Sequence, residues 1–514
     1  MPRQDYLTLI IYFLALFILA IPLGKLIATI LKNELPSAFA WLAPVERIVY
    51  RLSGINPQQE QKASAYLKDL LVFNLIGFVF LFLLLLGQGV LPLNPQGLTG
   101  LSWHLAFNTA VSFMTNTNWQ AYSGEAALSN LSQMLGLPTQ NLLSAATGLA
   151  VIAVIAPGLT RKQDGRVGNF ASDLVRITLY LFLPLAFSWA LLLAGQGVVQ
   201  SFAAFPEATT VEGSKQIVPL GPAASQIAIK QLGTNGGGFF GANSAHPFEN
   251  PTPFSNFLQV LAILLLPIAQ VLAFGKLLGN PKEGRAILSA MLLLFIPLLM
   301  MALWSEYSGV PALGATMEGK EVRFGVTESV LWGVATTAAS NGSVNAMHSS
   351  FTPLTGLVFL FQMLTGEVVL GGVGAGLYGM VLYVLITLFL AGLMVGRSPE
   401  WLGKKIEANE VKLALIALLV PSAFILIGTC LGLLMPWGLS ALSHQGPHGL
   451  SELLYGFAST VGNNGSAFGG LSAGSPILNT IFGFCMLVGR FVVIIPIVTI
   501  AGSLSAKKAV PASS

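Results

Sequence analysis

The stretch TNTN at residues 115–118 has three counterparts later in the chain: TNGG at 234–237, SNGS at 340–343 and NNGS at 463–466. A short apolar stretch of about 10–14 residues, the length of a re-entrant segment, precedes each one. These stretches are 101–114, 222–233, 329–339 and 449–460. Aligned on Asn118, Gly236, Gly342 and Gly465, the clusters lie 118, 106 and 123 residues apart. Equivalent parts at so long an interval predict four copies of one structural unit.

Long apolar segments complete each unit. A spanning helix needs about 20 apolar residues, and nine segments have that length: 6–30, 69–90, 140–159, 173–196, 255–278, 286–305, 368–396, 411–435 and 477–504. The unit is therefore a span, a short pore helix, a polar loop and a second span. We expect an all-α polytopic membrane protein with four such repeats around a pseudo-fourfold axis and an extra N-terminal spanning helix. The expected boundaries are 1–66 for the N-terminal helix and loop, then 67–162, 163–280, 281–398 and 399–514 for repeats I to IV.

The composition agrees with a membrane protein and excludes several other classes. Of 514 residues, 9% are charged and 54% hydrophobic, with a mean hydropathy of +0.74, whereas soluble domains have about 25% charged residues. The net charge of +4 is too small and too scattered for nucleic-acid binding. The sequence has neither a Walker A motif nor a phosphorylatable Asp-Lys-Thr-Gly, so we expect no bound nucleotide and no ATP hydrolysis by this chain.

The basic residues are unevenly divided between the connections. Eighteen Lys and Arg lie in 31–68, 160–176, 276–285, 397–412 and the C-terminal tail, whereas the intervening connections contain four. Cytoplasmic loops carry the excess of Lys and Arg. We therefore expect these basic loops in the cytoplasm and the N-terminus outside.

The four polar clusters are expected to form an ion filter. Non-helical backbone at membrane depth is tolerated only where it is buried or lines a water-filled cavity, and Gly permits backbone shapes that turn carbonyls toward an axis. Rings of carbonyls that replace a hydration shell select potassium in channels. The clusters have no Asp or Glu, which hard divalent ions prefer, so a monovalent cation is expected. The alternative is four external turns rich in Gly and Asn. The expected filter residues are Asn116, Thr117, Asn118, Thr234, Asn235, Gly236, Ser340, Asn341, Gly342, Asn463, Asn464 and Gly465.

Two ionisable residues, Glu367 and Arg490, lie between long apolar runs. Charges inside a membrane generally have a function. Arg490 is roughly 20 Å along the last span from Pro476, and we expect it to act as a positive gate below the filter; the alternative is that it reaches the cytoplasmic interface. For Glu367 the two interpretations are a position on the ion route and a simple partner for a neighbouring basic group.

Stretches beside the clusters are more specific. WQAYSGE follows the first cluster at 119–125 and GGFFGANSAHP overlaps the second at 237–247. NAMH follows the third at 345–348, SAF belongs to the fourth at 466–468, and GRF lies in the last span at 489–491. These stretches resemble the channel-like A subunit of the Kdp potassium-transporting ATPase, and the resemblance extends over nearly the whole chain.

The resemblance implies a member of the superfamily of potassium transporters built from four fused pore units. It implies a non-hydrolytic subunit in the bacterial inner membrane that selects potassium ions from outside and delivers them to a P-type ATPase catalytic subunit. A single-span C subunit and a small F subunit are the further partners that it implies. The filter positions of the family match Asn118, Gly236, Gly342 and Gly465, and Gln120 matches a position tied to potassium affinity. Glu367 and Arg490 match residues on the ion route.

The sequence departs from the family pattern at three places. Ser349 replaces an Asp that usually follows His348, and Asn341 stands where Cys is common. A tenth spanning helix, normal for the family, would follow Lys508, and either truncation or a natural variant would account for the difference. A stand-alone potassium channel or an ion-coupled transporter of the same superfamily is the first alternative function. The second is a membrane enzyme that uses Glu367 and the histidines, but these groups are scattered along the chain.

Overall fold

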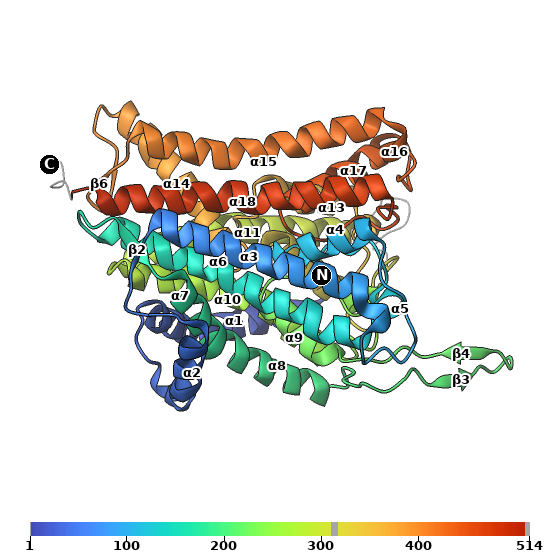
Figure 1. Cartoon of the computed structure of the whole chain (residues 1–514). Coiled ribbons are helices and arrows are strands. Elements are labelled where there is room, and N and C mark those ends of the chain that lie inside the picture. The colour runs from blue at the N-terminus through green and yellow to red at the C-terminus, as the bar shows by residue number, and fades with distance from the viewer. Residues whose placement is uncertain (1, 310–316, 509–514) are drawn as a thin grey trace.

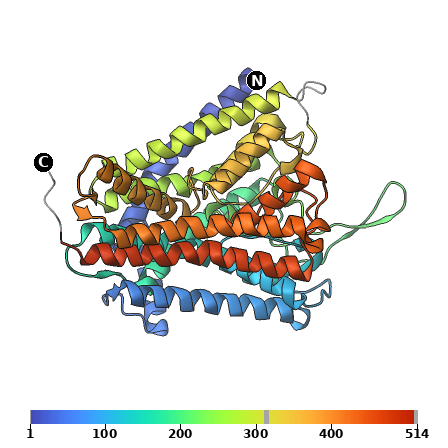
Figure 2. The same cartoon turned by 90° about the horizontal axis from the view of Figure 1, so that it is seen from above.

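The computed structural model describes residues 2–309 and 317–508, and the spanning helices lie side by side in it (Figures 1 and 2). Within these ranges nine helical segments are long and apolar enough to cross a membrane. They are α1 (Arg3–Leu31), α3 (Ala63–Gly87), α6 (Leu137–Thr160), α7 with η4 and α8 (Phe170–Ile177, Thr178–Phe182 and Leu183–Gly195), α10 (Pro253–Leu277), α11 (Pro281–Ser308), α14 (Ala375–Met394), α15 (Ala408–Leu434) and α18 (Pro476–Ala506). The all-α polytopic fold expected from the sequence is confirmed.

Four shorter helices lie between these spans, as predicted. They are α4 (Trp103–Met114), α9 (Ala223–Leu232), α12 (Gly325–Ala338) and α17 (Gly446–Val461). With 10 to 16 residues, none is long enough to cross a bilayer. Each packs against spans of its own repeat: α4 on α3 and α6, α9 on α8 and α10, α12 on α11, and α17 on α15 and α18. The boundaries between the repeats stay a prediction.

Repeat III differs from the expected unit. The span predicted at 368–396 begins only at Ala375, and a separate helix, α13 (Pro353–Leu364), precedes it. Residues 365–374 form a non-helical loop between the two helices, and this loop is buried from 367 onward. Gln270 of α10 satisfies part of its backbone, since its side chain donates to the Gly372 carbonyl (3.0 Å) and accepts from the Gly374 N–H (2.7 Å). The span itself is confirmed as α14, but its predicted start was wrong. Residues 368–374 are apolar in composition, although glycines and the positive φ at Glu367 and Leu370 interrupt the helix.

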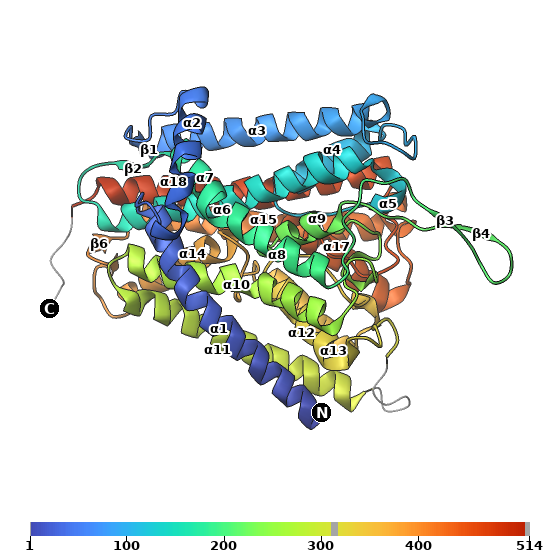
Figure 3. The same ribbon diagram turned by 90° about the horizontal axis from the view of Figure 1, so that it is seen from below.

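Short elements mark the two ends of the bundle (Figures 1 and 3). The strand pair β1 and β2 (Gln61–Lys62 and Arg166–Gly168) and the pair β5 and β6 (Glu400–Trp401 and Lys404–Lys405) lie at the end where the C-terminus is found. The hairpin of β3 and β4 (Glu207–Thr209 and Lys215–Ile217) projects from the opposite end. The remaining elements are η1 (Ser37–Leu42), α2 (Ala43–Ser53), η2 (Gln88–Val90), α5 (Gly124–Ala127), η3 (Ser132–Gly136), η5 (Asn243–Ala245), η6 (His348–Ser350) and α16 (Pro436–Leu439).

Two spans, α6 and α10, form the centre of the bundle. In each, 89% of the most apolar window is buried inside the protein, against 33% for the peripheral helix α1. Both central helices carry buried polar side chains, including Asn141 and Ser144 on α6 and Gln270 on α10. Polar groups at this depth need partners. Ser144 Oγ donates to Asn116, Gln270 bonds the 365–374 loop, and the backbone carbonyl of Asn141 accepts from Asn235 Nδ2.

Candidate functional site

The four polar clusters meet in one closed ring. We call them loop I (115–118), loop II (234–237), loop III (340–343) and loop IV (463–466). Three of the contacts are so close that a Cβ added to the glycine would lie within 2.0 Å of a carbonyl oxygen in the next loop: Gly236 beside Asn341 (1.7 Å), Gly342 beside Asn464 (1.9 Å) and Gly465 beside Thr117 (2.0 Å). The fourth contact is a hydrogen bond from Asn118 Nδ2 to the Gly236 carbonyl (2.7 Å). Each loop therefore contacts both of its neighbours.

The backbone has the same shape in all four loops. The first and third residues of an equivalent triplet have positive φ, whereas the middle residue does not. The values are 68° and 55° at Asn116 and Asn118, 48° and 79° at Thr234 and Gly236, 51° and 81° at Ser340 and Gly342, and 60° and 97° at Asn463 and Gly465. The alignment made from the sequence is thus the alignment of the backbone.

Side chains at the first position of the triplets tie neighbouring loops together. Asn116 Nδ2 donates to the Thr234 carbonyl (3.0 Å), and Ser340 Oγ donates to the Asn463 carbonyl (3.0 Å). Asn463 Nδ2 in turn donates to Thr117 Oγ1 (2.9 Å). The bonds run across loop boundaries, so the ring is held as a unit.

The middle residues of loops III and IV support their own turns. Asn341 Oδ1 accepts the N–H of Ser343 (3.0 Å), and Asn464 Oδ1 accepts the N–H of Ser466 (3.0 Å). An Asn that bonds the backbone two residues on is a common turn device. Asn341, which departs from the family pattern, therefore plays the same structural part as Asn464.

Gln120 lies beside the ring rather than in it. Its side chain holds the backbone of Gly238 in both directions, donating to the carbonyl (3.1 Å) and accepting from the N–H (2.8 Å). It thereby fixes the chain that leaves loop II.

Glu367 lies beside Gly462, the residue that precedes loop IV. Its side chain is 2% exposed, and neither carboxylate oxygen has a hydrogen-bond partner in the described part of the chain. A Cβ added to Gly462 would lie 3.5 Å from Glu367 Oε1. Gly462 is the residue at which α17 ends, and a helix C-terminus carries partial negative charge. Within residues 2–309 and 317–508 no basic side chain pairs with Glu367, which does not support its interpretation as an ordinary ion-pair partner.

Arg490 lies in the middle of α18, where it is 3% exposed. Its Nη2 donates to the Ser144 carbonyl of α6 (2.8 Å), and its Nη1 donates to the Tyr378 hydroxyl (3.4 Å). Ser144 Oγ also donates to Asn116 Oδ1 of loop I (2.8 Å). The guanidinium is thus connected to Asn116 of loop I through a single residue, Ser144, and both of its hydrogen bonds are made inside the helix bundle.

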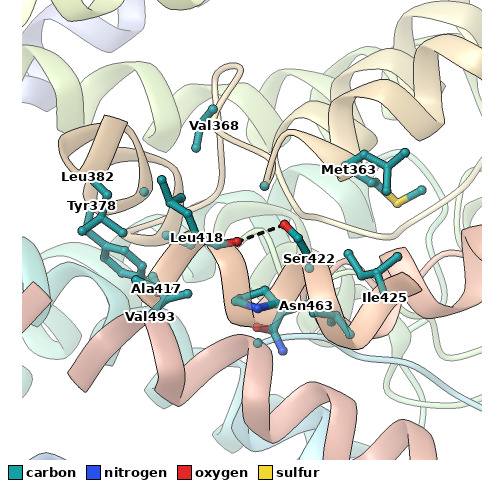
Figure 4. Close-up of a pocket in the computed structure, with 18 of the residues that line it drawn as sticks. Met363, Val368, Tyr378, Leu382, Ala417, Leu418, Ser422, Ile425, Asn463 and Val493 are labelled. Atoms are coloured by element: carbon teal, nitrogen blue, oxygen red, sulfur yellow. Dashed lines mark hydrogen bonds between the residues drawn. The ribbon is translucent and has the colours of Figure 1, made fainter. Parts of the chain in front are cut away.

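A cavity of about 90 Å³ lies beside loop IV, between the 365–374 loop, α14, α15 and α18 (Figure 4). Asn463 lines it from the ring. The other labelled lining residues are mostly apolar: Met363, Val368, Tyr378, Leu382, Ala417, Leu418, Ser422, Ile425 and Val493.

Two residues that support the ring, Gln270 through the 365–374 loop and Lys230 directly, were not identified from the sequence. Gln270 binds the 365–374 loop, whose Val373 N–H donates to Thr234 Oγ1 in loop II (2.8 Å). Lys230, in α9, donates to the Gly237 carbonyl (2.7 Å). The available signals were a charged side chain in the short helix α9 and an amide in the long apolar run of α10.

Known proteins are similar to this chain over nearly its whole length. Residues 10–514 match the family described as Potassium-transporting ATPase A subunit. A potassium-transporting ATPase potassium-binding subunit of Pseudomonas aeruginosa is 55% identical over 98% of this chain and 91% of its own length. The corresponding subunit of Sorangium cellulosum is 52% identical over 98% and 90%.

A solved structure has the same fold. The potassium transporter TrkH from Vibrio parahaemolyticus superposes with a TM-score of 0.53 at 14% identity, covering 96% of this chain and 97% of that one. At this identity the likeness establishes the architecture alone. The family match and the relatives show that the chain belongs to the family of the potassium-transporting ATPase A subunit.

Proposed function

We propose that the ring of loops I to IV binds potassium ions from the outside and that the chain passes them to a P-type ATPase subunit. The observation that carries this proposal is the closed contact between four loops of equivalent backbone shape. The ligands would be backbone carbonyls and hydroxyls of Asn116, Thr117, Asn118 and their counterparts at 234–236, 340–342 and 463–465. The transported ion is the only ligand in this proposal.

The electrostatics of the ring favour a monovalent cation. The short helices α4, α9, α12 and α17 end at the loops, so that four C-terminal dipole ends surround the ring. No residue of the four clusters is acidic, whereas divalent cations prefer sites with carboxylates. Uncharged oxygens combined with a weak negative field suit an ion that loses its water easily.

Glu367 and Arg490 then act in sequence on the inner side of the ring. The unpaired carboxylate at the end of α17 attracts an ion that leaves loop IV, and the guanidinium on α18 opposes straight passage toward the cytoplasm. The cavity beside loop IV offers a lateral route between repeats III and IV. A partner that receives the ion laterally would supply the ATP hydrolysis for which this chain has no motif.

The names of the relatives support a multisubunit assembly, since they are potassium-binding subunits of an ATPase. We propose the P-type catalytic subunit, the single-span C subunit and the small F subunit as partners, in a bacterial inner membrane. The excess of Lys and Arg in the alternate loops supports an N-terminus outside.

Potassium uptake by reconstituted vesicles tests the proposal. The chain is co-purified with its ATPase partner, and uptake is measured with and without ATP. Accumulation that requires both ATP and the partner is expected. Uptake by the chain alone, driven only by the potassium gradient or a second ion, would instead support the stand-alone channel or the ion-coupled transporter.

A further inference from the structure

One position behind the ring differs sharply between the four repeats. In each repeat the middle residue of the triplet donates its N–H to a backbone carbonyl near the end of the preceding short helix. The residue that supplies this carbonyl stands five places before the middle residue. The four bonds are Thr117 to Ser112 (2.8 Å), Asn235 to Lys230 (2.8 Å), Asn341 to Thr336 (3.0 Å) and Asn464 to Ser459 (2.8 Å). Three repeats therefore have a small hydroxyl at this position, and repeat II has a lysine.

The Lys230 side chain is completely buried against its own loop. Besides the Gly237 carbonyl, Nζ contacts Glu249 Oε2 (2.7 Å), Ser244 Oγ (3.0 Å) and Asn243 Oδ1 (3.1 Å). Lys230 and Glu249 both have side chains that are 0% exposed. An ammonium has three hydrogens to donate, and here it is surrounded by four oxygens.

The contact with Gly237 has a counterpart in repeat I. Gly237 and Trp119 both follow the third residue of their triplet, and Ser112 Oγ donates to the Trp119 carbonyl (3.0 Å). Lys230 thus makes in repeat II the bond to a backbone carbonyl that Ser112 makes in repeat I. Because its side chain is longer, Lys230 also bonds side chains of the 237–249 segment. Glu249 completes this connection because its Oε1 accepts the Phe240 N–H (2.9 Å).

A need for stability does not account for the charges. A buried ion pair generally contributes little net stability, because desolvation offsets the attraction, whereas removal of one partner is costly. In repeat I the equivalent carbonyl, that of Trp119, is bonded by the uncharged hydroxyl of Ser112. The pair is also balanced, so that an incoming cation meets no net positive charge from Lys230.

We infer that Lys230 and Glu249 are positioning residues that hold the Gly237 carbonyl and the outer rim of loop II in the geometry that prefers potassium. The inference rests on the proposed filter function. It predicts that repeat II sets the ion preference through this pair. Ser112 is the counterpart in repeat I, whereas the hydroxyls of Thr336 and Ser459 make other bonds, to Asn341 Oδ1 (3.2 Å) and from the Gly465 N–H (3.0 Å).

The test compares two double variants in the complex purified with its ATPase partner. Lys230→Ser with Glu249→Gln removes both charges and supplies the hydroxyl that the other repeats have. Lys320→Ser with Glu306→Gln is the matched control, since this pair is also buried (Nζ to Oε2, 3.1 Å) but lies outside loops I to IV. ATP hydrolysis is titrated with K⁺, Rb⁺, NH₄⁺ and Na⁺, and Tm reports folding.

The Lys230/Glu249 double variant should raise the KM for K⁺ about tenfold, equivalent to about 1.4 kcal/mol, and reduce the preference for K⁺ over Na⁺. The maximal rate should stay within about twofold of the unmodified complex, because the residues touch no transferred group. The control should alter Tm but not the ion preference. A folded double variant with the original KM and preference would overturn the inference.

Lys230→Arg keeps the test decisive if the double variant does not fold. Arginine retains the charge and the pairing with Glu249, but its planar fork cannot reproduce the compact ammonium at Gly237. A weaker preference for K⁺ at nearly unchanged Tm is expected, and an unchanged preference would contradict the inference. Failure of the unmodified complex to prefer K⁺ over Na⁺ would instead count against the proposed filter.

Discussion

Gly236→Ala tests the ring at its tightest contact. The added Cβ would lie 1.7 Å from the Asn341 carbonyl oxygen and 2.8 Å from the Ser343 nitrogen. Since carbon contacts are comfortable at about 3.5 Å, loop III has to move by roughly 2 Å, or loop II has to leave the ring. The φ of 79° adds backbone strain for any residue other than glycine, at a cost of roughly 1–2 kcal/mol.

The displaced group is a carbonyl that we propose as part of the potassium site. A hydrogen bond or equivalent contact to a charged group contributes about 1.5–3 kcal/mol, so loss of one should weaken potassium binding roughly ten- to hundredfold. The assay is calorimetric titration of the purified chain with K⁺, supported by the K⁺-dependent rise in Tm. An alanine variant that binds K⁺ as tightly as the unmodified chain would refute the reasoning.

Gly54→Ala separates backbone strain from the steric effect. Gly54 ends α2 with a φ of 66°, and an added Cβ would meet nothing within 4 Å. This variant should lose stability by a similar amount through strain, yet bind potassium normally. Equal loss of binding in both variants would show that general destabilisation, and not the ring, is responsible.

Three further outcomes are expected. Arg490→Gln should raise passive potassium leak from loaded vesicles without ATP on the order of thirtyfold, because a guanidinium about 7 Å from the ion repels it by roughly 2 kcal/mol at an effective dielectric near 20; equal leak in both proteins would contradict a gating role. The purified chain alone should not accumulate potassium against a gradient when ATP is added. Concentrative uptake would refute the proposal that a partner subunit hydrolyses the ATP. Burial lowers the pKa of His348 to about 3, so the unfolded chain takes up a proton below about pH 6.5 that the folded chain does not; stability should therefore fall with acidity below that pH, and His348→Gln should lessen the dependence of Tm on pH.

Much of the architecture could be predicted because membrane burial imposes simple patterns. Runs such as 6–30 and 255–278 correspond closely to α1 and α10, since a spanning helix satisfies its backbone internally and needs apolar side chains throughout. The short helices were predictable for the complementary reason, namely that each is too short to span and ends at a polar cluster. The alignment on Gly236 and its counterparts paired positions that have equivalent φ in the four loops, although the φ values themselves were not predicted.

The 365–374 loop could not be predicted because hydropathy does not measure conformation. Residues 368–374 contain only Val, Leu and Gly, so hydropathy does not distinguish them from α14. The tertiary bonds from Gln270 and Thr234 make the non-helical backbone tolerable at this depth. Hydropathy windows consequently joined the loop to the following span.

The charged residue behind loop II shows a different limit of sequence reasoning. A single lysine in α9 could face the lipid or pair with an acidic side chain, and the sequence does not say which. Only the fold brings Glu249, 19 residues later, into contact, with Lys230 Nζ 2.7 Å from Glu249 Oε2. Likewise, the depth of Arg490 could be calculated from its place in the last span, but its bond to Ser144 depends on how α18 packs on α6.

The central claim is that potassium binds within the ring, and the direct measurement is ion density in a structure determined in K⁺ and again after exchange for Tl⁺, whose stronger scattering identifies the site. The account predicts density enclosed by the backbone of Asn118, Gly236, Gly342 and Gly465 and their preceding residues, replaced by stronger density in Tl⁺. A ring without ion density in both conditions, or an ion bound only at Glu367 or elsewhere, would contradict it.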